Sequence, residues 1–161
     1  MTRPRRVMGI AVSSLKIGFA YLIDGELMDW KLSIDASRTE EACFAKVDEW
    51  LSYYQPDVLV IEDPEYSRKG SNSLLLQSAL KKAAVESEVR IVEMPRGTDA
   101  ANKYAEAEAL AAEFPQIMAW LPGRRRAWEQ EPRNIILFEA LALAWSWWRT
   151  SAPPDEETIE W

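Results

Sequence analysis

The sequence predicts an α/β fold with a mixed five-stranded sheet flanked by helices, and three observations support this prediction. Three β-rich apolar segments come first, at residues 7–12, 17–23 and 27–32, with short polar turns between them. Two further apolar segments, at 58–61 and 89–94, alternate with stretches that have helical spacing. Three antiparallel strands followed by βαβ units form one mixed sheet.

The first three segments are expected to form an antiparallel meander. Asp24-Gly25 is a typical hairpin turn between the second and third segments. This turn accounts for Asp24, so we assign it no further role. In the third segment Met28, Trp30 and Leu32 alternate with other residues, and we expect these three side chains to share one face of the sheet.

Helical spacing predicts the remaining elements. Ser37 or Thr39 can cap a first helix, which Pro56 ends. The uninterrupted apolar run at 58–61 is typical of a strand buried on both faces. We expect further helices at 74–84, 100–114 and 134–149, and an irregular segment at 116–133. Residues 1–150 are predicted to form a single domain, with 151–161 as a polar, flexible tail.

The composition excludes several kinds of site. The 161 residues include no histidine and a single cysteine, Cys43. These counts rule out zinc fingers, Ser-His-Asp triads, Cys-His nucleophiles and an internal disulfide. Any bound metal must therefore be held by oxygen ligands, which suits Mg²⁺, Mn²⁺ or Ca²⁺.

The charge and the hydropathy pattern favour an acidic protein of the cytoplasm. The net charge is −7, from 19 basic and 26 acidic residues, so a generally basic coat for nucleic acid is absent. Basic residues still cluster at 3–6, 68–69, 81–82 and 124–126, which leaves a local phosphate-binding face open. No stretch reaches the ~20 apolar residues of a membrane helix, and no cleavage site follows the first apolar run.

Three motifs in this order carry a resemblance to a known family. The segment 9–20 reads GIAVSSLKIGFA, Val60-Ile61-Glu62-Asp63 ends the fourth expected strand, and 138–144 reads FEALALA in the last helix. Together they resemble the bacterial Holliday-junction resolvase family RuvC and its phage relatives, over about Val7 to Trp148. The resemblance implies a ribonuclease H-like fold, in which acidic residues hold two Mg²⁺ ions for attack on a phosphodiester.

The resemblance names Glu62 and Glu139 as catalytic and metal-ligating candidates, and it also shows two departures from the family. The family's first aspartate falls on Ala11, and one of its two acids in the last helix falls on Ile136. We therefore expect a DNA-structure-binding protein with a degenerate nuclease centre, derived from a phage or mobile element. We expect Glu62 and Glu139 to lie close together, with Ala11 beside them.

Other interpretations of these acids remain open. An active endonuclease dependent on Mg²⁺ or Mn²⁺ would use Glu62 and Glu139 with a third ligand such as Asp63 or Glu131. A protein-interaction scaffold without nucleic acid is favoured by the acidic balance. The ordinary explanations are the start of a loop for Glu62, a turn for Asp63 and a helix start for Glu131. If Glu139 lies on the buried side of its helix, its carboxylate needs a partner in a site or an ion pair, and the alternative is an exposed polar stripe.

The resemblance also implies nucleic-acid contacts in the loop that follows Glu62. The family carries an aromatic wedge there, followed by phosphate contacts, and these roles fall on Tyr66, Arg68 and Lys69. Lys103 stands where such enzymes place a phosphate-facing lysine. These residues make branched DNA the expected partner. The alternative role for Ser71 or Asn72 is a helix cap.

The tryptophans of the last helix suggest a homodimer. Trp145, Trp147 and Trp148 project in three directions on a helix, so one core-facing stripe does not bury all of them. Because aromatic side chains are enriched at interfaces, we expect a second copy to cover part of this surface. The alternative is that the segment 116–133 of the same chain covers it.

Overall fold

The computed structural model describes residues 5–13, 16–63, 71–95, 103–121 and 134–151, with the backbone alone for 71–74 and 151. The strands are β1 (Arg6–Val12), β2 (Ile17–Ile23), β3 (Glu26–Ser33), β4 (Val58–Glu62) and β5 (Arg90–Met94). The helices are α1 (Glu40–Tyr54), α2 (Ser71–Glu86), α3 (Lys103–Glu113) and α4 (Ile135–Ser151), with 3₁₀ turns η1 (Asp35–Ser37) and η4 (Pro115–Trp120).

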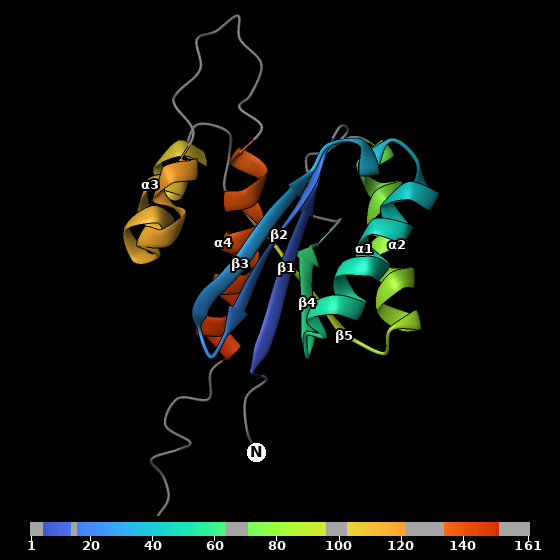
Figure 1. Ribbon diagram of the computed structural model, residues 1–161, viewed down its shortest axis with the longest axis horizontal. Helices are drawn as coiled ribbons and strands as arrows, with labels where there is room; N and C mark the ends of the chain where they lie inside the picture. The colour runs from blue at the N-terminus through green and yellow to red at the C-terminus, as the bar shows by residue number, and fades with distance from the viewer. Residues whose placement is uncertain (1–4, 14–15, 64–70, 96–102, 122–133, 152–161) are drawn as a thin grey trace, which may run out of the picture.

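The five strands form one mixed sheet in the order β3-β2-β1-β4-β5. The pairs β1–β2 and β2–β3 are antiparallel, and the pairs β1–β4 and β4–β5 are parallel. Helices α1 and α2 lie on one face of the sheet and α4 lies on the other, with α3 packed on the outer side of α4 (Figure 1). The predicted α/β fold and its mixed sheet are therefore confirmed.

The β2–β3 hairpin corrects one prediction. Asp24 and Gly25 adopt φ angles of 52° and 82°, as a tight hairpin turn requires. The register then shifts between Tyr21 and Leu22, because Tyr21 pairs with Asp29 while Leu22 pairs with Leu27. Met28 is the extra residue of this bulge and is 54% exposed. Leu27, not Met28, therefore joins the core, and the predicted stripe of Met28, Trp30 and Leu32 is wrong at its first member.

Helix α4 packs very closely on the sheet because glycines and alanines line the contact. A Cβ atom added to Gly9 of β1 would lie 2.2 Å from the carbonyl oxygen of Ala140 and 3.1 Å from the Cβ of Ala144. Gly18 of β2, which pairs with Ala11, lies beneath Ile136. The beginning of α4 therefore covers the carboxyl end of β1, and α4 runs antiparallel to that strand.

The opposite face holds a separate core under α1 and α2. Thr39 caps α1, because its Oγ1 accepts a hydrogen bond of 3.0 Å from the backbone nitrogen of Ala42. Phe19 of β2 is fully buried there, and its ring meets the rings of Trp50 and Tyr54 edge-on at 4.7 and 5.0 Å.

Cys43 lies within this core and is expected to be chemically inert. Its side chain is fully buried, and burial raises the pKa of the thiol to about 12. The reactive thiolate is therefore scarce at neutral and mildly alkaline pH. We expect iodoacetamide to leave Cys43 unmodified in the folded protein at pH 8 and to modify it in urea. Mass spectrometry checks this, and rapid labelling of the folded chain would contradict the observed packing.

The structure accounts for the tryptophans of α4 within one chain. Trp147 and Trp148 are buried, at 7% and 9% exposure, and Trp145 stacks edge-on against Phe114 at 4.9 Å. Helix α4 lies between the sheet and α3, so apolar residues on both of these sides of the helix are buried. The observation that suggested a homodimer is explained without one, and the homodimer stays a prediction.

The segment that follows α3 is more regular than the sequence suggested. Residues 115–120 form a 3₁₀ turn where the sequence suggested irregular structure, and Gln116 Nε2 donates a 2.9 Å hydrogen bond to the carbonyl of Leu27. The rest of that segment, 122–133, lies outside the described residues.

Among the helices that the structure describes, none is long and apolar enough to cross a bilayer.

Candidate functional site

Glu62 is the last residue of β4, and its side chain lies on the α4 face of the sheet. Val58 and Val60 belong to the core under α4, while Leu59 and Ile61 belong to the core under α1 and α2. Because side chains alternate along a strand, Glu62 follows Val58 and Val60 onto the α4 face. It is half-buried. Asp63 follows the end of β4, and its backbone nitrogen donates a 2.9 Å hydrogen bond to the carbonyl of Met94.

Ala11 lies level with Glu62 on the same face. In the parallel β1–β4 pair, Val7 is opposite Val58 and Gly9 is opposite Val60. Two residues further along both strands, the same offset places Ala11 beside Glu62. The methyl group of Ala11 is 4% exposed and belongs to the core under α4. The predicted juxtaposition of Ala11 and Glu62 therefore follows from the strand register.

Ile136 and Glu139 come from the first turns of α4, which cover this end of the sheet. Ile136 is 1% exposed, and its Cγ2 contacts Gly18, the β2 partner of Ala11. Glu139 lies one turn later, on the same side of α4 as Ala142 and Leu143, which line a small hollow with Met94 of β5. The structure thus brings Ala11, Glu62, Ile136 and Glu139 to one end of one sheet face.

Glu139 is one of three buried polar or charged side chains among the described residues, and it forms an ion pair with Lys103. Its carboxylate is 6% exposed, and its Oε2 accepts a contact of 3.2 Å from the ammonium of Lys103. Lys103 is the first residue of α3 and is 23% exposed. This ion pair ties the start of α3 to α4. The prediction of Lys103 as a site residue did not foresee it, because no local pattern pairs residues so far apart in the chain.

The described residues at this end of the sheet do not fit a two-metal centre. Such a centre needs several hard oxygen ligands around each ion. Ala11 and Ile136 present alkyl groups, and one carboxylate, Glu139, already contacts an ammonium. Among the described residues, no group of three or more Asp, Glu, Cys or His side chains could hold a metal ion.

The remaining predicted site residues fall outside the described parts of the chain. Tyr66, Arg68 and Lys69 belong to 64–70, and Glu131 belongs to 122–133. Chain connectivity nevertheless attaches the segment 64–70 to Glu62 at one end and to the start of α2 at the other. Their assignment as nucleic-acid contacts stays a prediction.

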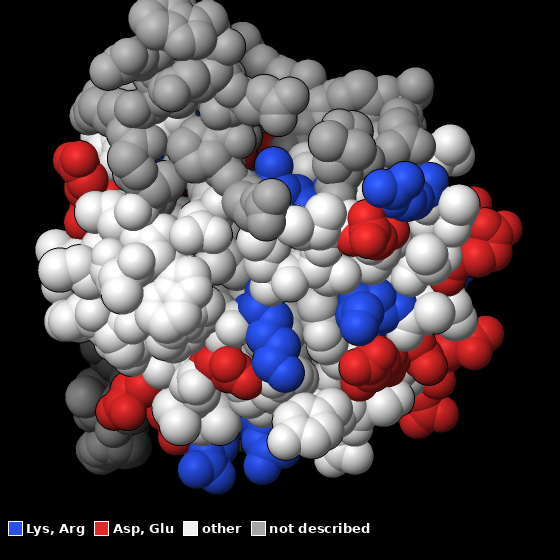
Figure 2. Space-filling view, turned by 45° about the horizontal axis from the view of Figure 1, so that its top comes forward, with Lys and Arg blue, Asp and Glu red and all other residues white. Residues whose placement is uncertain are grey.

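Some basic side chains on the described surface are paired with acidic ones. Lys81 pairs with Glu93 at 2.6 Å, and Arg5 pairs with Asp24 at 3.1 Å, so these basic clusters are partly neutralised. Figure 2 shows basic and acidic side chains interspersed, with acidic ones gathering over the α1 and α2 side of that view. A phosphate-binding face must therefore be local.

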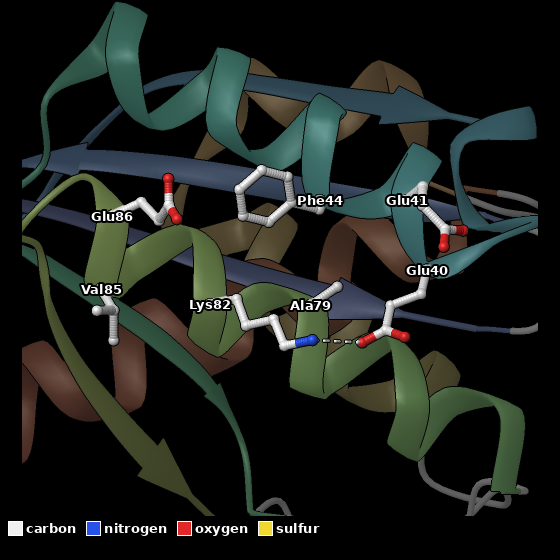
Figure 3. A pocket seen from close by; sticks show the side chains of 7 residues that line it. All are labelled: Glu40, Glu41, Phe44, Ala79, Lys82, Val85 and Glu86. Carbon is white, nitrogen blue, oxygen red and sulfur yellow. Dashed lines mark hydrogen bonds and ion pairs between the residues drawn. The ribbon is translucent and has the colours of Figure 1, made fainter.

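A groove of about 510 Å³ lies between α1 and α2, on the sheet face opposite Glu139 (Figure 3). Phe44, Ala79 and Val85 form its apolar part. An ion pair of 3.4 Å between Lys82 and Glu40 closes one side, while Glu41 and Glu86 add negative charge. This acidic lining repels a phosphate backbone, so the groove is not the nucleic-acid site.

Sequence comparison finds no match for the chain. No family model matches it, and no curated protein matches it. Structural comparison gives a different result.

Three solved structures share the fold over nearly the whole chain. RuvC of Thermus thermophilus in complex with a Holliday-junction substrate is 18% identical, with a TM-score of 0.59 over 91% of this chain and 96% of that one. Fowlpox virus resolvase in complex with substrate Holliday-junction DNA is 14% identical, with a TM-score of 0.62 over 92% and 99%. The large terminase nuclease of the thermophilic phage G20c is 15% identical, with a TM-score of 0.54 over 90% and 84%. The chain therefore has the ribonuclease H-like fold, in the form found in RuvC and other Holliday-junction resolvases, which is the resemblance that its sequence motifs predicted.

Proposed function

We propose that this protein binds branched DNA with a RuvC-type domain whose nuclease centre has degenerated. The observation that carries the proposal is the set of side chains at the carboxyl ends of β1 and β4. There a fold shared with junction resolvases presents the alkyl groups of Ala11 and Ile136, together with a carboxylate already paired to Lys103. Such a centre retains two of the family's four acidic positions, Glu62 and Glu139, and has alkyl groups at the other two.

The DNA contacts are assigned to the segment that leaves β4 at Glu62. Arg68 and Lys69 supply phosphate contacts, and Tyr66 supplies a ring that stacks on an unpaired base. This location agrees with the described surface, because the neighbouring lysines of α2, Lys81 and Lys82, are paired with carboxylates and the α1/α2 groove is acidic. A net charge of −7 makes the attraction local and sensitive to salt.

Mobility shifts on four-way, forked and linear duplexes test the proposal. We expect the wild-type protein to shift four-way DNA at low salt, and Arg68→Ala with Lys69→Ala to weaken binding to every shape alike, because phosphates carry no sequence. Few phosphates are neutralised, so log K should fall with log salt by only about 0.9 per contact. Tyr66→Ala should weaken binding to four-way and forked DNA most, since only unstacked bases receive its ring.

A matched control removes two positive charges elsewhere. Lys81→Ala with Lys82→Ala gives the same change in net charge on α2, where both ammonium groups already contact carboxylates. We expect this variant to bind DNA like the wild type. If it binds as weakly as the Arg68 and Lys69 variant, the attraction is a general charge effect. If the wild type shifts none of the DNAs, the protein-interaction scaffold replaces this proposal.

The same DNAs with Mn²⁺ or Mg²⁺ separate a binder from an active endonuclease. We expect no cleavage of any shape by the wild type, because two of the ligand positions carry alkyl groups. Cleavage that Glu62→Gln abolishes would favour the active enzyme, with a third ligand from outside the described residues.

A further inference from the structure

We propose that the ammonium of Lys103 takes the place of a divalent cation at Glu139, so that this centre is balanced by an internal cation instead of a metal. The inference rests on the proposed degenerate centre and adds to it the residue that compensates for the missing metal. It starts from the one buried acidic side chain among the described residues, Glu139.

Glu139 needs a positive partner in this position. Its carboxylate is 6% exposed and lies in the first half of α4, where the neighbouring residues, such as Phe138 and Ala140, are apolar. A buried carboxylate without a partner is strongly disfavoured relative to the same group in water. In a metal centre the divalent ion supplies the compensating charge. Here the described contact is the Nζ atom of Lys103, at 3.2 Å from Oε2.

The position of the Lys103 side chain indicates that its contact with the Glu139 carboxylate holds it in place. Lys103 is the first residue of α3, and a helix N-terminus disfavours a cation because the backbone dipole is positive there. Three quarters of its side chain are nevertheless buried, with 23% exposed. A lysine at the start of a surface helix would extend into solvent if nothing attracted it. The Glu139 carboxylate, near the start of α4, provides that attraction.

The ammonium and a metal ion compete for the same carboxylate. A Mg²⁺ ion binds a carboxylate oxygen at about 2.0–2.1 Å, which would place it next to the ammonium and in repulsion with it. Ala11, where the family places its first aspartate, offers no ligand to offset that repulsion. The alanine at position 11 and the lysine at position 103 therefore both disfavour metal binding at Glu139.

If the ammonium of Lys103 competes with the metal ion, restoring the acid at position 11 is not enough to restore metal binding. Ala11→Asp supplies a ligand but leaves the ammonium in place, and the new carboxylate is a further acidic group that the ammonium can pair with. Metal binding should therefore return only when Ala11→Asp is combined with Lys103→Met, which removes the cation and keeps an unbranched side chain of similar length.

Calorimetric titration with MnCl2 tests the coupling on four proteins: the wild type, Ala11→Asp, Lys103→Met and the double variant. We expect the double variant to bind Mn²⁺ at least about tenfold more tightly than Ala11→Asp, and the wild type to give no measurable binding. Equal affinities of Ala11→Asp and the double variant would overturn the proposal, as would tight binding by the wild type.

Thermal unfolding with and without MnCl2 gives a second readout when Lys103→Met destabilises the fold. The double variant gathers three carboxylates without a cation, so its Tm should be low without metal and should rise on adding Mn²⁺. Ala11→Asp with Lys103→Arg keeps a cation at this place and should show no Mn²⁺-dependent rise. A rise as large as that of the double variant would overturn the proposal. DNA binding by the wild type is measured separately, so the two proposals fail on different results.

Discussion

Gly9→Ala is expected to lower the free energy of unfolding by about 3 kcal/mol or more, the largest effect of any single added methyl group that the structure suggests. The new Cβ would lie 2.2 Å from the carbonyl oxygen of Ala140 and 3.0 Å from the backbone nitrogen of Ala144. Both atoms belong to the helix backbone, so no side-chain rotation relieves the overlap. Helix α4 must move away from the sheet, which also shifts Glu139 relative to Lys103. Urea denaturation followed by circular dichroism measures the loss.

Gly18→Ala is the matched control, because it makes the same substitution on the neighbouring strand under the same helix. There the Cβ would lie 3.2 Å from Cγ2 of Ile136, a side-chain atom that can shift, and 3.3 Å from the carbonyl oxygen of Lys31. Alanine also lowers the backbone entropy of the unfolded chain relative to glycine, which offsets part of the crowding. We expect a loss below about 1 kcal/mol. Equal losses for the two variants would contradict the close approach of α4 at Gly9.

Phe19→Ala is expected to cost about 3–5 kcal/mol, because it empties the centre of the core under α1. The Phe19 ring has no exposed surface and meets Trp50 and Tyr54 edge-on. Removing it leaves a cavity and removes ring contacts between β2 and α1. Denaturation curves of the variant give the loss directly.

Tyr53→Ala provides the control from the same aromatic cluster. The Tyr53 ring contacts that of Tyr54 at 4.8 Å, but its side chain is 78% exposed. It therefore buries little apolar surface, and we expect its removal to cost less than about 1 kcal/mol. If this variant loses as much stability as Phe19→Ala, burial does not decide the contribution of a ring in this cluster.

The fold could be predicted from the sequence because its signals are local. The Asp24-Gly25 turn, the apolar run of β4 and the Thr39 cap each depend on residues close together in the chain. The bulge at Met28 could not be predicted, since alternation alone gives no sign of an inserted residue. It is visible only in the pairing of β2 with β3.

The candidate site was predictable in part for a similar reason. The motifs around Glu62 and Glu139 placed both acids on the ends of elements that a mixed sheet brings to one side. The ion pair between Glu139 and Lys103 depends on how α3 packs against α4, and no sequence period records that packing. The exposure of the α4 tryptophans was also misjudged, because α3 covers the outer side of α4.

The packing of α4 on β1 has a consequence for how the chain acquires its fold. The first strand and the last helix form one core, so the sheet face of Val7, Ala20 and Leu22 stays uncovered until residues 135–151 have been synthesised. Contacts between such distant parts of a chain slow folding, because a long loop must close before they form. A nascent chain cannot bury this apolar sheet face before α4 has emerged, and transiently exposed apolar surface of this kind favours aggregation and chaperone binding.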